Sequence, residues 1–512
     1  MSSGMSLLVP IITMALALVT KNAYFSLVVG VFFGSFIFCG LDIFRSSSFV
    51  FSVMEESLAG NNIKVIAFLV LLGSIVSLIN KTGVSEIYAD LIGKKVKTKR
   101  GVLLLTSFFS AIFFLDDYFN CLTTGNIVRP ISENKRIFPG RIAHVIHSTA
   151  IPVCILVPIS SWAAAISSTF TDSGATDGLS LFVKTIPYNF YALIALFSVL
   201  IVSIFDISFF TMKKEETKFL KNSDSFSENN LKRTSENIDN ECLHNSEKNS
   251  VRSFILKLAL PLVFLIISCI FCLLYTGGIT KGSGFLDSIA NCDSSTGLLM
   301  GAAFAFGFMF LLYVIILRIV KLGDFFNSIS EGLKEMSGAI VVLALAWSLG
   351  TLTSKYLKIG DLFANILKSN MAVACWIPLL LFAIAAVLSV ATGTSWGTFA
   401  ILIPVSFPVL QAQGSQSILL SSLAAILSGA AFGDNVSPIS DTTIMASTSS
   451  GCNPLIHSFT QMPYAVVNAS VAAVCFLLAG FIQNVLLLLL VAISLVIFSW
   501  LFIKKFSNRK SA

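Results

Sequence analysis

Apolar segments about as long as a bilayer is thick recur along almost the whole chain. An α-helix needs about 20 residues to cross the hydrocarbon core, where it satisfies its own backbone hydrogen bonds. Charged residues make up 12% of the 512 residues, against about 25% in soluble domains. The sequence therefore predicts an all-α polytopic protein embedded in a lipid bilayer. Its uninterrupted spans lie near residues 7–20, 23–44, 63–80, 189–211, 253–276, 296–320, 338–352, 464–483 and 484–505.

The formal net charge of +7 is modest, and the basic residues gather at the ends of apolar runs. This distribution indicates basic loops on the cytoplasmic face of a membrane rather than a surface for nucleic acid, so no nucleic-acid partner is expected. The ten cysteines are scattered through apolar segments. We therefore expect neither structural disulfides nor a metal cluster.

One stretch in the second half, S-G-A-A-F-G-D-N-V-S-P-I-S-D-T-T at 428–443, is polar although long apolar runs flank it. Two glycines precede Pro438, which disfavours a continuous helix. Where a helix breaks at membrane depth, its freed carbonyls and amides must line a cavity or be buried in protein. A carboxylate beside such a break indicates an ion or proton site. A polar turn outside the membrane is the alternative, and it is less favoured because similar stretches occur elsewhere in the chain.

The first of these similar stretches is L-D-D-Y-F-N-C-L-T-T-G-N, which follows the apolar run 101–115. Basic loops lie on both sides of it, at 94–100 and 129–141, and both should be on the same side of the membrane. A re-entrant hairpin with Asp116 and Asp117 at its tip satisfies this requirement. Residues 141–168 are then expected to form one crossing interrupted by Pro152 and Pro158.

The second half repeats this plan. A segment from 373 to 412 is interrupted by A-T-G-T-S-W-G-T, and a broken crossing follows at 415–450. Shifting the chain by 280 positions aligns Pro158-Ile159-Ser160 with Pro438-Ile439-Ser440 without a gap. The first half has an odd number of full crossings, so the repeat must be inverted in the membrane. Inverted repeats with discontinuous helices are typical of secondary transporters, with the site near the midplane.

This division predicts four regions and about eleven full crossings in total. A first transmembrane repeat covers 1–211, and a polar cytoplasmic linker rich in Glu, Asn, Ser and Lys covers 212–252. The second, inverted repeat covers 253–483, and an additional helix with a basic tail covers 484–512. The composition of the linker is typical of a solvated segment.

Four motifs together resemble the NhaC family of Na⁺/H⁺ antiporters. They are L-D-D-Y-F-N-C-L-T-T-G-N-I-V-R-P-I, S-T-A-I-P-V-C-I-L-V-P-I-S-S-W, A-T-G-T-S-W-G-T-F-A and F-G-D-N-V-S-P-I-S-D-T-T. The resemblance implies a multi-pass secondary antiporter of the bacterial cytoplasmic (inner) membrane that exchanges Na⁺ for H⁺. Some relatives instead couple organic anions such as malate and lactate, or amino acids. The chain departs from the common pattern at Asn435, where many members have His.

Na⁺ is a hard cation that prefers oxygen ligands. A buried carboxylate can hold either this ion or a proton, because desolvation and a nearby like charge favour its protonated form. Asp434, Asp441 and Asp117 are the candidate Na⁺ ligands, and no cofactor is expected besides the transported ions. The full set of candidate ion- or substrate-binding residues is Asp116, Asp117, Asn120, Thr124, Ser160, Thr392, Gly393, Thr394, Ser395, Thr398, Asp434, Asn435, Ser437, Ser440, Asp441 and Thr442.

Several of these residues also have a plainer interpretation. Asp116 could cap a helix, and we expect only one of the adjacent pair, Asp117, to face the site. Asp434 could likewise be a cap, for which Asn would serve as well. The hydroxyl residues around Gly393 could simply allow close helix packing. His144 and His147 lie three apart and are interpreted as helix-packing residues, and Arg129 as a marker of the cytoplasmic boundary.

Other functions remain open at this point. The same residues could serve an Na⁺- or H⁺-coupled organic anion or amino acid transporter, an ion channel, or, more remotely, an intramembrane aspartyl protease. G-T-S-W-G at 393–397 matches the G-x-S-x-G nucleophile motif, but that motif requires a strand-to-helix turn. It lies in a helical apolar run, so we interpret the match as accidental. A homodimer is a further possibility.

Overall fold

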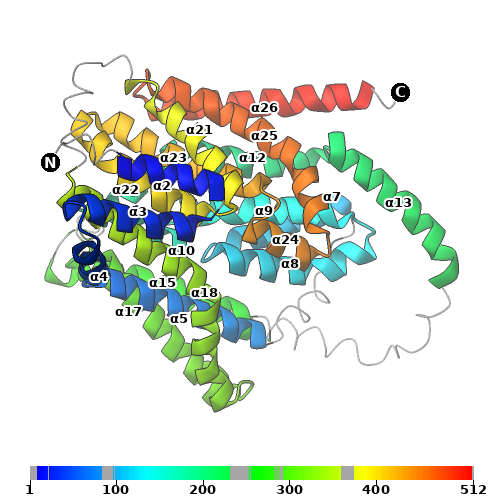
Figure 1. Cartoon of the computed structure of the whole chain (residues 1–512). Helices are drawn as coiled ribbons and strands as arrows, with labels where there is room; N and C mark the ends of the chain where they lie inside the picture. Colours follow the sequence, from blue (N-terminus) through cyan, green and yellow to red (C-terminus); the bar gives the residue numbers. More distant parts are fainter. Residues whose placement is uncertain are drawn as a thin grey trace.

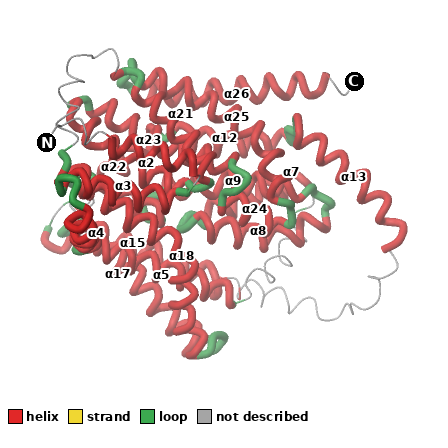
Figure 2. The backbone as a smooth tube through the Cα atoms, in the orientation of Figure 1, coloured by secondary structure: helices red, strands yellow, loops and turns green. Residues whose placement is uncertain are grey.

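The computed structural model describes residues 8–20, 22–82, 98–230, 255–282, 292–358 and 374–509, together with a few isolated positions. The regular elements of this part are all helices (Figures 1 and 2). In chain order the α-helices are α2 (Leu8–Thr20), α3 (Ala23–Phe38), α4 (Ile43–Leu58), α5 (Asn61–Lys81), α7 (Lys99–Ile112), α8 (Asp117–Asn134), α9 (Pro139–Leu156), α10 (Ser161–Asp172), α11 (Gly178–Thr185), α12 (Phe190–Phe205), α13 (Phe210–Asn230), α15 (Leu260–Thr276), α17 (Ser294–Met309), α18 (Leu322–Thr351), α21 (Ile377–Thr392), α22 (Ser395–Gln413), α23 (Gln416–Val436), α24 (Asp441–Ser450), α25 (Pro454–Ala479) and α26 (Val485–Arg509).

Within the described residues, seven helices are long and apolar enough to cross a bilayer, and the number rises to eleven if each bent helix pair is one span. One such pair is α9 with α10, which meet at an angle of 47°. The prediction of an all-α polytopic membrane protein with about eleven crossings and broken helices is confirmed.

Four helix interruptions organise the centre of the protein. The hairpin α7–α8 turns at 113–116, and the hairpin α21–α22 turns at 393–394. The helices α9 and α10 are separated by 157–160, and α23 and α24 by 437–440. The last residues of α9 and α23 are 280 positions apart, and so are the first residues of α10 and α24. This spacing equals the shift of 280 positions that aligns the two halves of the sequence.

Side-chain caps fix where the helices restart after these interruptions. The N-cap residues Asp116, Ser160, Thr394 and Ser440 each accept a hydrogen bond from a backbone N–H in the first turn of α8, α10, α22 and α24. Such caps satisfy amide groups that the helix itself leaves unpaired. Gly393 ends α21 with φ of 70°, a left-handed conformation that favours glycine. The sequence therefore encodes the breaks locally.

The two halves interlock through their short helices. Helix α24 packs against α8 and α9 of the first half, and α10 packs against α22 of the second half and against α18. Helices α5, α15, α17 and α18 form a second group, seen at the lower left of Figure 1. Glycines allow close backbone contact between α8 and α24 and between α5 and α18. A Cβ atom at Gly125 of α8 would lie 2.0 Å from Ser449 Oγ of α24, and one at Gly73 of α5 would lie 2.8 Å from the carbonyl oxygen of Gly332 in α18.

Ion pairs lie at both ends of the helix bundle. At one end, the fully buried Arg141 of α9 donates to Asp206 Oδ1 at 2.9 Å, and Lys99 of α7 lies 3.0 Å from the same oxygen. Lys99 also pairs with Glu216 of α13, so this network ties α13 to the core. At the other end, Lys64 of α5 lies 3.3 Å from Asp293, the N-cap residue of α17.

Several expected boundaries were wrong. Pro152 lies inside α9 and does not interrupt it, so the only break in this crossing lies at 157–160. Helix α4 was not expected, and it bends back from α3 by 120°. Helix α18 begins at Leu322 and bends by 50° between Gly338 and Ile340, so the expected span 338–352 corresponds to its second segment and the polar first segment was not expected. The predicted linker 212–252 starts as helix α13, and the rest of it lies outside the described residues.

Candidate functional site

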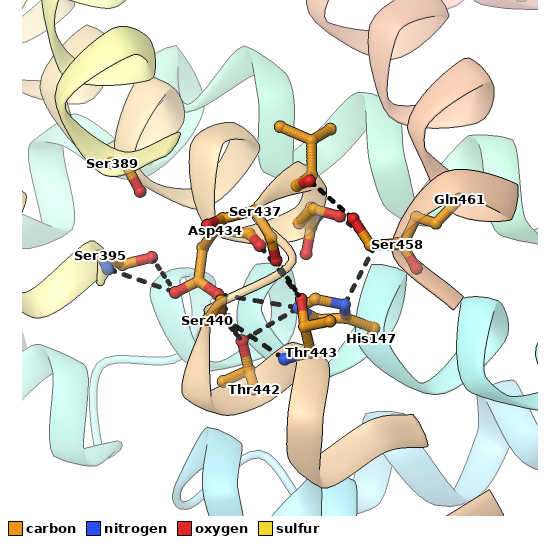
Figure 3. Close-up of polar contacts among 12 residues, drawn as sticks. His147, Ser389, Ser395, Asp434, Ser437, Ser440, Thr442, Thr443, Ser458 and Gln461 are labelled. Carbon is orange, nitrogen blue, oxygen red and sulfur yellow. Dashed lines mark hydrogen bonds and ion pairs between the residues drawn. The ribbon is translucent and has the colours of Figure 1, made fainter. Parts of the chain in front are cut away.

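Asp434 lies in the last turn of α23, and the residue is 3% exposed. Its Oδ2 atom accepts hydrogen bonds from the backbone N–H of Ser395 at 3.2 Å and from the Ser395 hydroxyl at 2.5 Å. Its Oδ1 atom accepts hydrogen bonds from the hydroxyls of Ser440 and Thr442 (Figure 3). The carboxylate thus joins the turn of one hairpin to both sides of the α23–α24 break.

Asp434 is therefore not an N-cap, because Thr394 and Ser440 cap the neighbouring helices. It does satisfy one otherwise unpaired amide of α22, that of Ser395. Such an amide could also be satisfied by an asparagine side chain. The three hydroxyl contacts are different, because hydroxyl oxygens have lone pairs that can also bind a cation.

The structure places Asp441 outside this cluster. Its side chain is exposed, and none of the hydrogen bonds recorded among the described residues joins it to Asp434. The reason is geometric, because Ser440 is an N-cap with extended backbone, where side chains two residues apart point to the same side. Ser440 and Thr442 face Asp434 at the start of α24, whereas Asp441 between them points away.

The end of α23 is held by side chains from α25 and α24. Gln461 of α25 donates to the carbonyl of Asn435 at 3.0 Å, and Ser458 donates to that of Val436 at 2.9 Å. Thr443 of α24 donates to the carbonyl of Ser437 at 2.9 Å. These bonds satisfy carbonyls that the helix leaves free at its end. They hold the break in a defined shape beside Asp434.

His147 of α9 completes the surroundings of Asp434. Its Nε2 atom lies 3.0 Å from Thr442 Oγ1 and 3.8 Å from Asp434 Oδ1. Its Nδ1 atom lies 3.1 Å from Nε2 of His457 and 3.2 Å from Nε2 of Gln461. The amide nitrogen of Gln461 is a donor, which assigns Nδ1 as the acceptor and leaves Nε2–H to donate toward Thr442.

The sequence interpretation of His147 as a packing residue therefore missed its place in the site. His144 fits that interpretation better, since its ring packs on Tyr464 with ring centres 4.4 Å apart. The role of His147 differs from that of His144 because His147 has the partners His457 and Gln461 on α25. The spacing of residues within α9 does not reveal these partners.

The remaining second-half residues line the same break or support its walls. The Asn435 amide donates to the Tyr191 hydroxyl at 2.9 Å, and Ser437 donates to the carbonyl of Val390 at 3.0 Å. The hydroxyls of Thr392 and Thr398 bond to carbonyls one turn earlier in their own helices. We find these two threonines in the hairpin wall rather than in contact with Asp434.

In the first half, Asp116 and Asp117 have different surroundings. Asp116 caps α8, accepting from Phe119 N at 3.0 Å, and its other oxygen accepts from the Ser161 hydroxyl at 2.9 Å. Asp117 is fully buried, and neither carboxylate oxygen has a hydrogen-bond partner among the described residues. The negative charge of Asp434 lies within its electrostatic reach.

The other first-half candidates have structural contacts. Asn120 donates to the carbonyl of Ser110 at 2.6 Å and accepts from Thr124 at 3.1 Å. Ser160 caps α10 and donates to the carbonyl of Cys154 at 2.6 Å. Arg129 pairs with Glu133 at 2.8 Å near the end of α8, away from the carboxylates of the hairpin turn.

Comparison with known proteins shows the family of this chain. The model of the Na⁺/H⁺ antiporter family matches residues 153–481, which include the second hairpin and both sides of the α23–α24 break. The chain belongs to the Na⁺/H⁺ antiporter family. It is thus a multi-pass secondary transporter rather than an enzyme, and the described residues around G-T-S-W-G contain no strand.

Relatives of this antiporter differ in how much of the chain they cover. An uncharacterized protein of Haemophilus influenzae is 30% identical over 496 residues, which are 94% of this chain and 91% of that protein. An uncharacterized Na⁺/H⁺ antiporter of Haemophilus influenzae is 31% identical over 168 residues, 30% of this chain and 34% of that protein. The malate-2H⁺/Na⁺-lactate antiporter of Bacillus subtilis is 36% identical over 101 residues, 20% of this chain and 21% of that protein.

Among solved structures, the YdaH transporter of Alcanivorax borkumensis has a similar fold. The TM-score is 0.53 at 13% identity, and the match covers 85% of this chain and 88% of that one. The likeness concerns the fold alone.

Proposed function

We propose that this antiporter exchanges Na⁺ for H⁺ across the bacterial cytoplasmic membrane, and that Asp434 binds the Na⁺ near the membrane midplane. The observation that carries the proposal is a carboxylate, 3% exposed, surrounded by three hydroxyl groups where two helix interruptions meet. The side chains that contact Asp434 in the described part of the chain include no lysine or arginine. A cation from solution can supply the missing positive charge.

The hydroxyl groups suit both the occupied and the empty site. In the empty site, Ser395, Ser440 and Thr442 donate to the carboxylate and lower the cost of burying its charge. When Na⁺ enters, the same hydroxyls can rotate and offer their lone pairs to the ion. Na⁺ has no directional preference that would require a rigid cage, so rotation of three hydroxyls is sufficient to form its ligand shell.

Proteoliposomes that contain the purified protein and a trapped pH dye test the proposal. An inward Na⁺ gradient should drive protons out and raise the internal pH, and an outward gradient should lower it. An equal gradient of choline chloride controls for ionic strength. If no Na⁺ gradient changes the internal pH, the protein is not a Na⁺/H⁺ antiporter.

A second function is favoured by the similarity to the malate-2H⁺/Na⁺-lactate antiporter, which covers a fifth of the chain. The same vesicles should therefore also be supplied with malate inside and lactate outside. A pH change that requires both an organic anion and Na⁺ would replace simple Na⁺/H⁺ exchange by coupled anion exchange. The absence of lysine and arginine side chains around Asp434, within the described residues, favours simple exchange at this site.

A further inference from the structure

Asp117, the first residue of α8, is a buried carboxyl group without donors. Its side chain is 0% exposed, and both of its oxygens lack a hydrogen-bond partner among the described residues. The indole N–H of Trp162 is likewise buried without a hydrogen-bond partner among the described residues. An ionised carboxylate in such surroundings costs several kcal/mol relative to water. A group that is only structural would not be expected to bear this cost.

The groups that face Asp117 do not supply a positive charge. Those on its own helix are Asp116, Tyr118 and Cys121. From other helices, Cys154 of α9 and Asp434 of α23 face it. At longer range, Glu335 of α18 faces Asp116, and Asp441 of α24 faces Tyr118. All of these groups are neutral or negative. An ionised Asp117 would therefore have neither a cationic side chain nor a hydrogen-bond donor beside it among the described residues, which makes the carboxyl group suited to hold a proton.

Asp434 has the opposite surroundings, although it is buried to a similar extent. Its two oxygens accept four hydrogen bonds, from one backbone N–H and three hydroxyls, all of which stabilise the ionised form. Two buried carboxyl groups in such contrasting environments are suited to different roles. One is prepared to bind a cation, and the other to hold a proton.

We propose that Asp117 is the proton-carrying group of the exchange, and that Na⁺ binding at Asp434 releases its proton. The proposal rests on the proposed function and assigns the proton within it. In the empty state the charge of Asp434 opposes ionisation of Asp117 across the space between them. When Na⁺ neutralises Asp434, this repulsion disappears and the O–H bond of Asp117 gives its proton to water. By thermodynamic linkage, reprotonation of Asp117 weakens Na⁺ binding by the same factor.

The test measures proton release directly. Purified protein in detergent and weak buffer, with a pH dye, is titrated with sodium chloride, and choline chloride is the ionic control. The wild-type protein should release protons with the same half-saturation as its thermal stabilisation by Na⁺. The Asp117→Asn variant should still be stabilised by Na⁺, within about threefold of the wild-type half-saturation, but its proton release should fall at least tenfold.

Asp42→Asn is the control, since it changes a carboxyl group that lies outside the site. Asp42 is an exposed N-cap of α4, a role that asparagine fills about equally well. This variant should keep both Na⁺ binding and proton release. In vesicles, Asp117→Asn should keep exchange of radioactive Na⁺ for unlabelled Na⁺ and lose the pH response to a Na⁺ gradient.

The proposal is overturned if the Asp117→Asn variant releases as many protons as the wild-type protein. It is also overturned if this variant no longer binds Na⁺, because that result would place Asp117 in the Na⁺ site. If Asp117→Asn does not fold, Asp117→Glu decides the question. If Asp117 carries the proton, the Asp117→Glu variant should release protons on Na⁺ binding over a different pH range from the wild type. An unchanged pH dependence of proton release would contradict the proposal. Failure of the wild type to bind Na⁺ is a different result, because it refutes the proposed function itself.

Discussion

The Asp434→Asn substitution is the most direct test of the ion site. It keeps the size of the side chain and one acceptor oxygen, but it removes the charge. If the amide oxygen takes the place of Oδ1, the amide nitrogen faces the backbone N–H of Ser395, which lies 3.2 Å from Oδ2 in the wild type. Two donors then oppose each other, and the backbone N–H cannot rotate away.

The effect on ion binding should be larger than the effect on stability. Two unit charges 4 Å apart attract each other by about 4 kcal/mol at an effective dielectric constant of about 20. Loss of this attraction should weaken Na⁺ binding about 1000-fold, since about 1.4 kcal/mol corresponds to a factor of ten. The opposite amide rotamer keeps an acceptor for Ser395 and turns the amide nitrogen toward the hydroxyls of Ser440 and Thr442, so loss of the charge-assisted hydrogen bonds should lower the free energy of unfolding by about 1–3 kcal/mol. The variant should therefore fold but not exchange ions.

Two measurements on the same preparation separate these effects. Size-exclusion chromatography with a thermal unfolding assay reports folding, and Na⁺-driven pH change in proteoliposomes reports exchange. Asp42→Asn is a matched control, because Asp42 is an exposed N-cap of α4 that accepts from the amides of Phe44 and Arg45. If Asp434→Asn exchanges Na⁺ with a half-saturation within tenfold of the wild type, Asp434 is a structural residue and not the Na⁺ ligand.

Three further predictions concern packing, charge and topology. Gly125→Ala should lower the free energy of unfolding by about 1–3 kcal/mol, because the new Cβ atom meets Ser449. The additional substitution Ser449→Gly should restore thermal stability. If it does not, the loss of stability arises from another contact. Arg141→Met should lower stability by roughly 3 kcal/mol, because it breaks a buried charged network, and a thermal melt equal to that of the wild type would contradict this role. Single cysteines at Lys213 and Lys281, in a cysteine-free background, should be labelled from the cytoplasmic and the external side respectively, and labelling of both from one side would disprove the inverted repeat.

The sequence predicted the helix interruptions well because their causes are local. Pro438 and the capping residue Ser440 end and restart a helix through their own backbone and side-chain chemistry. Polar residues inside an apolar run then identified Asp434. Boundaries set by tertiary contacts were harder to predict. The polar half of α18 resembles a loop in sequence, yet Glu331 in it pairs with Lys81 of α5 at 2.8 Å.

The parts of the site that come from distant helices could not be predicted from spacing. His147 reaches Asp434 and Thr442 only because α9 packs against α24. Its partner His457 follows it by 310 residues. The orientation of the Asp441 side chain was not predicted for another reason. Its position between Ser440 and Thr442 in the sequence does not show which side of the helix start it occupies. Composition predicts which chemistry is present, whereas packing decides which groups meet.

The glycine contacts between helices restrict how the protein can move. Gly125 leaves no room between α8 and α24, and Gly73 leaves none between α5 and α18. Helices in such close backbone contact cannot slide past each other without a clash. When Asp434 is exposed first to one side of the membrane and then to the other, α8 must travel with α24, and α5 with α18. Helix α18 also packs against α10 and α22, so any movement between these pairs of helices has to change that contact, and a crosslink from α18 to α10 or α22 should then stop transport.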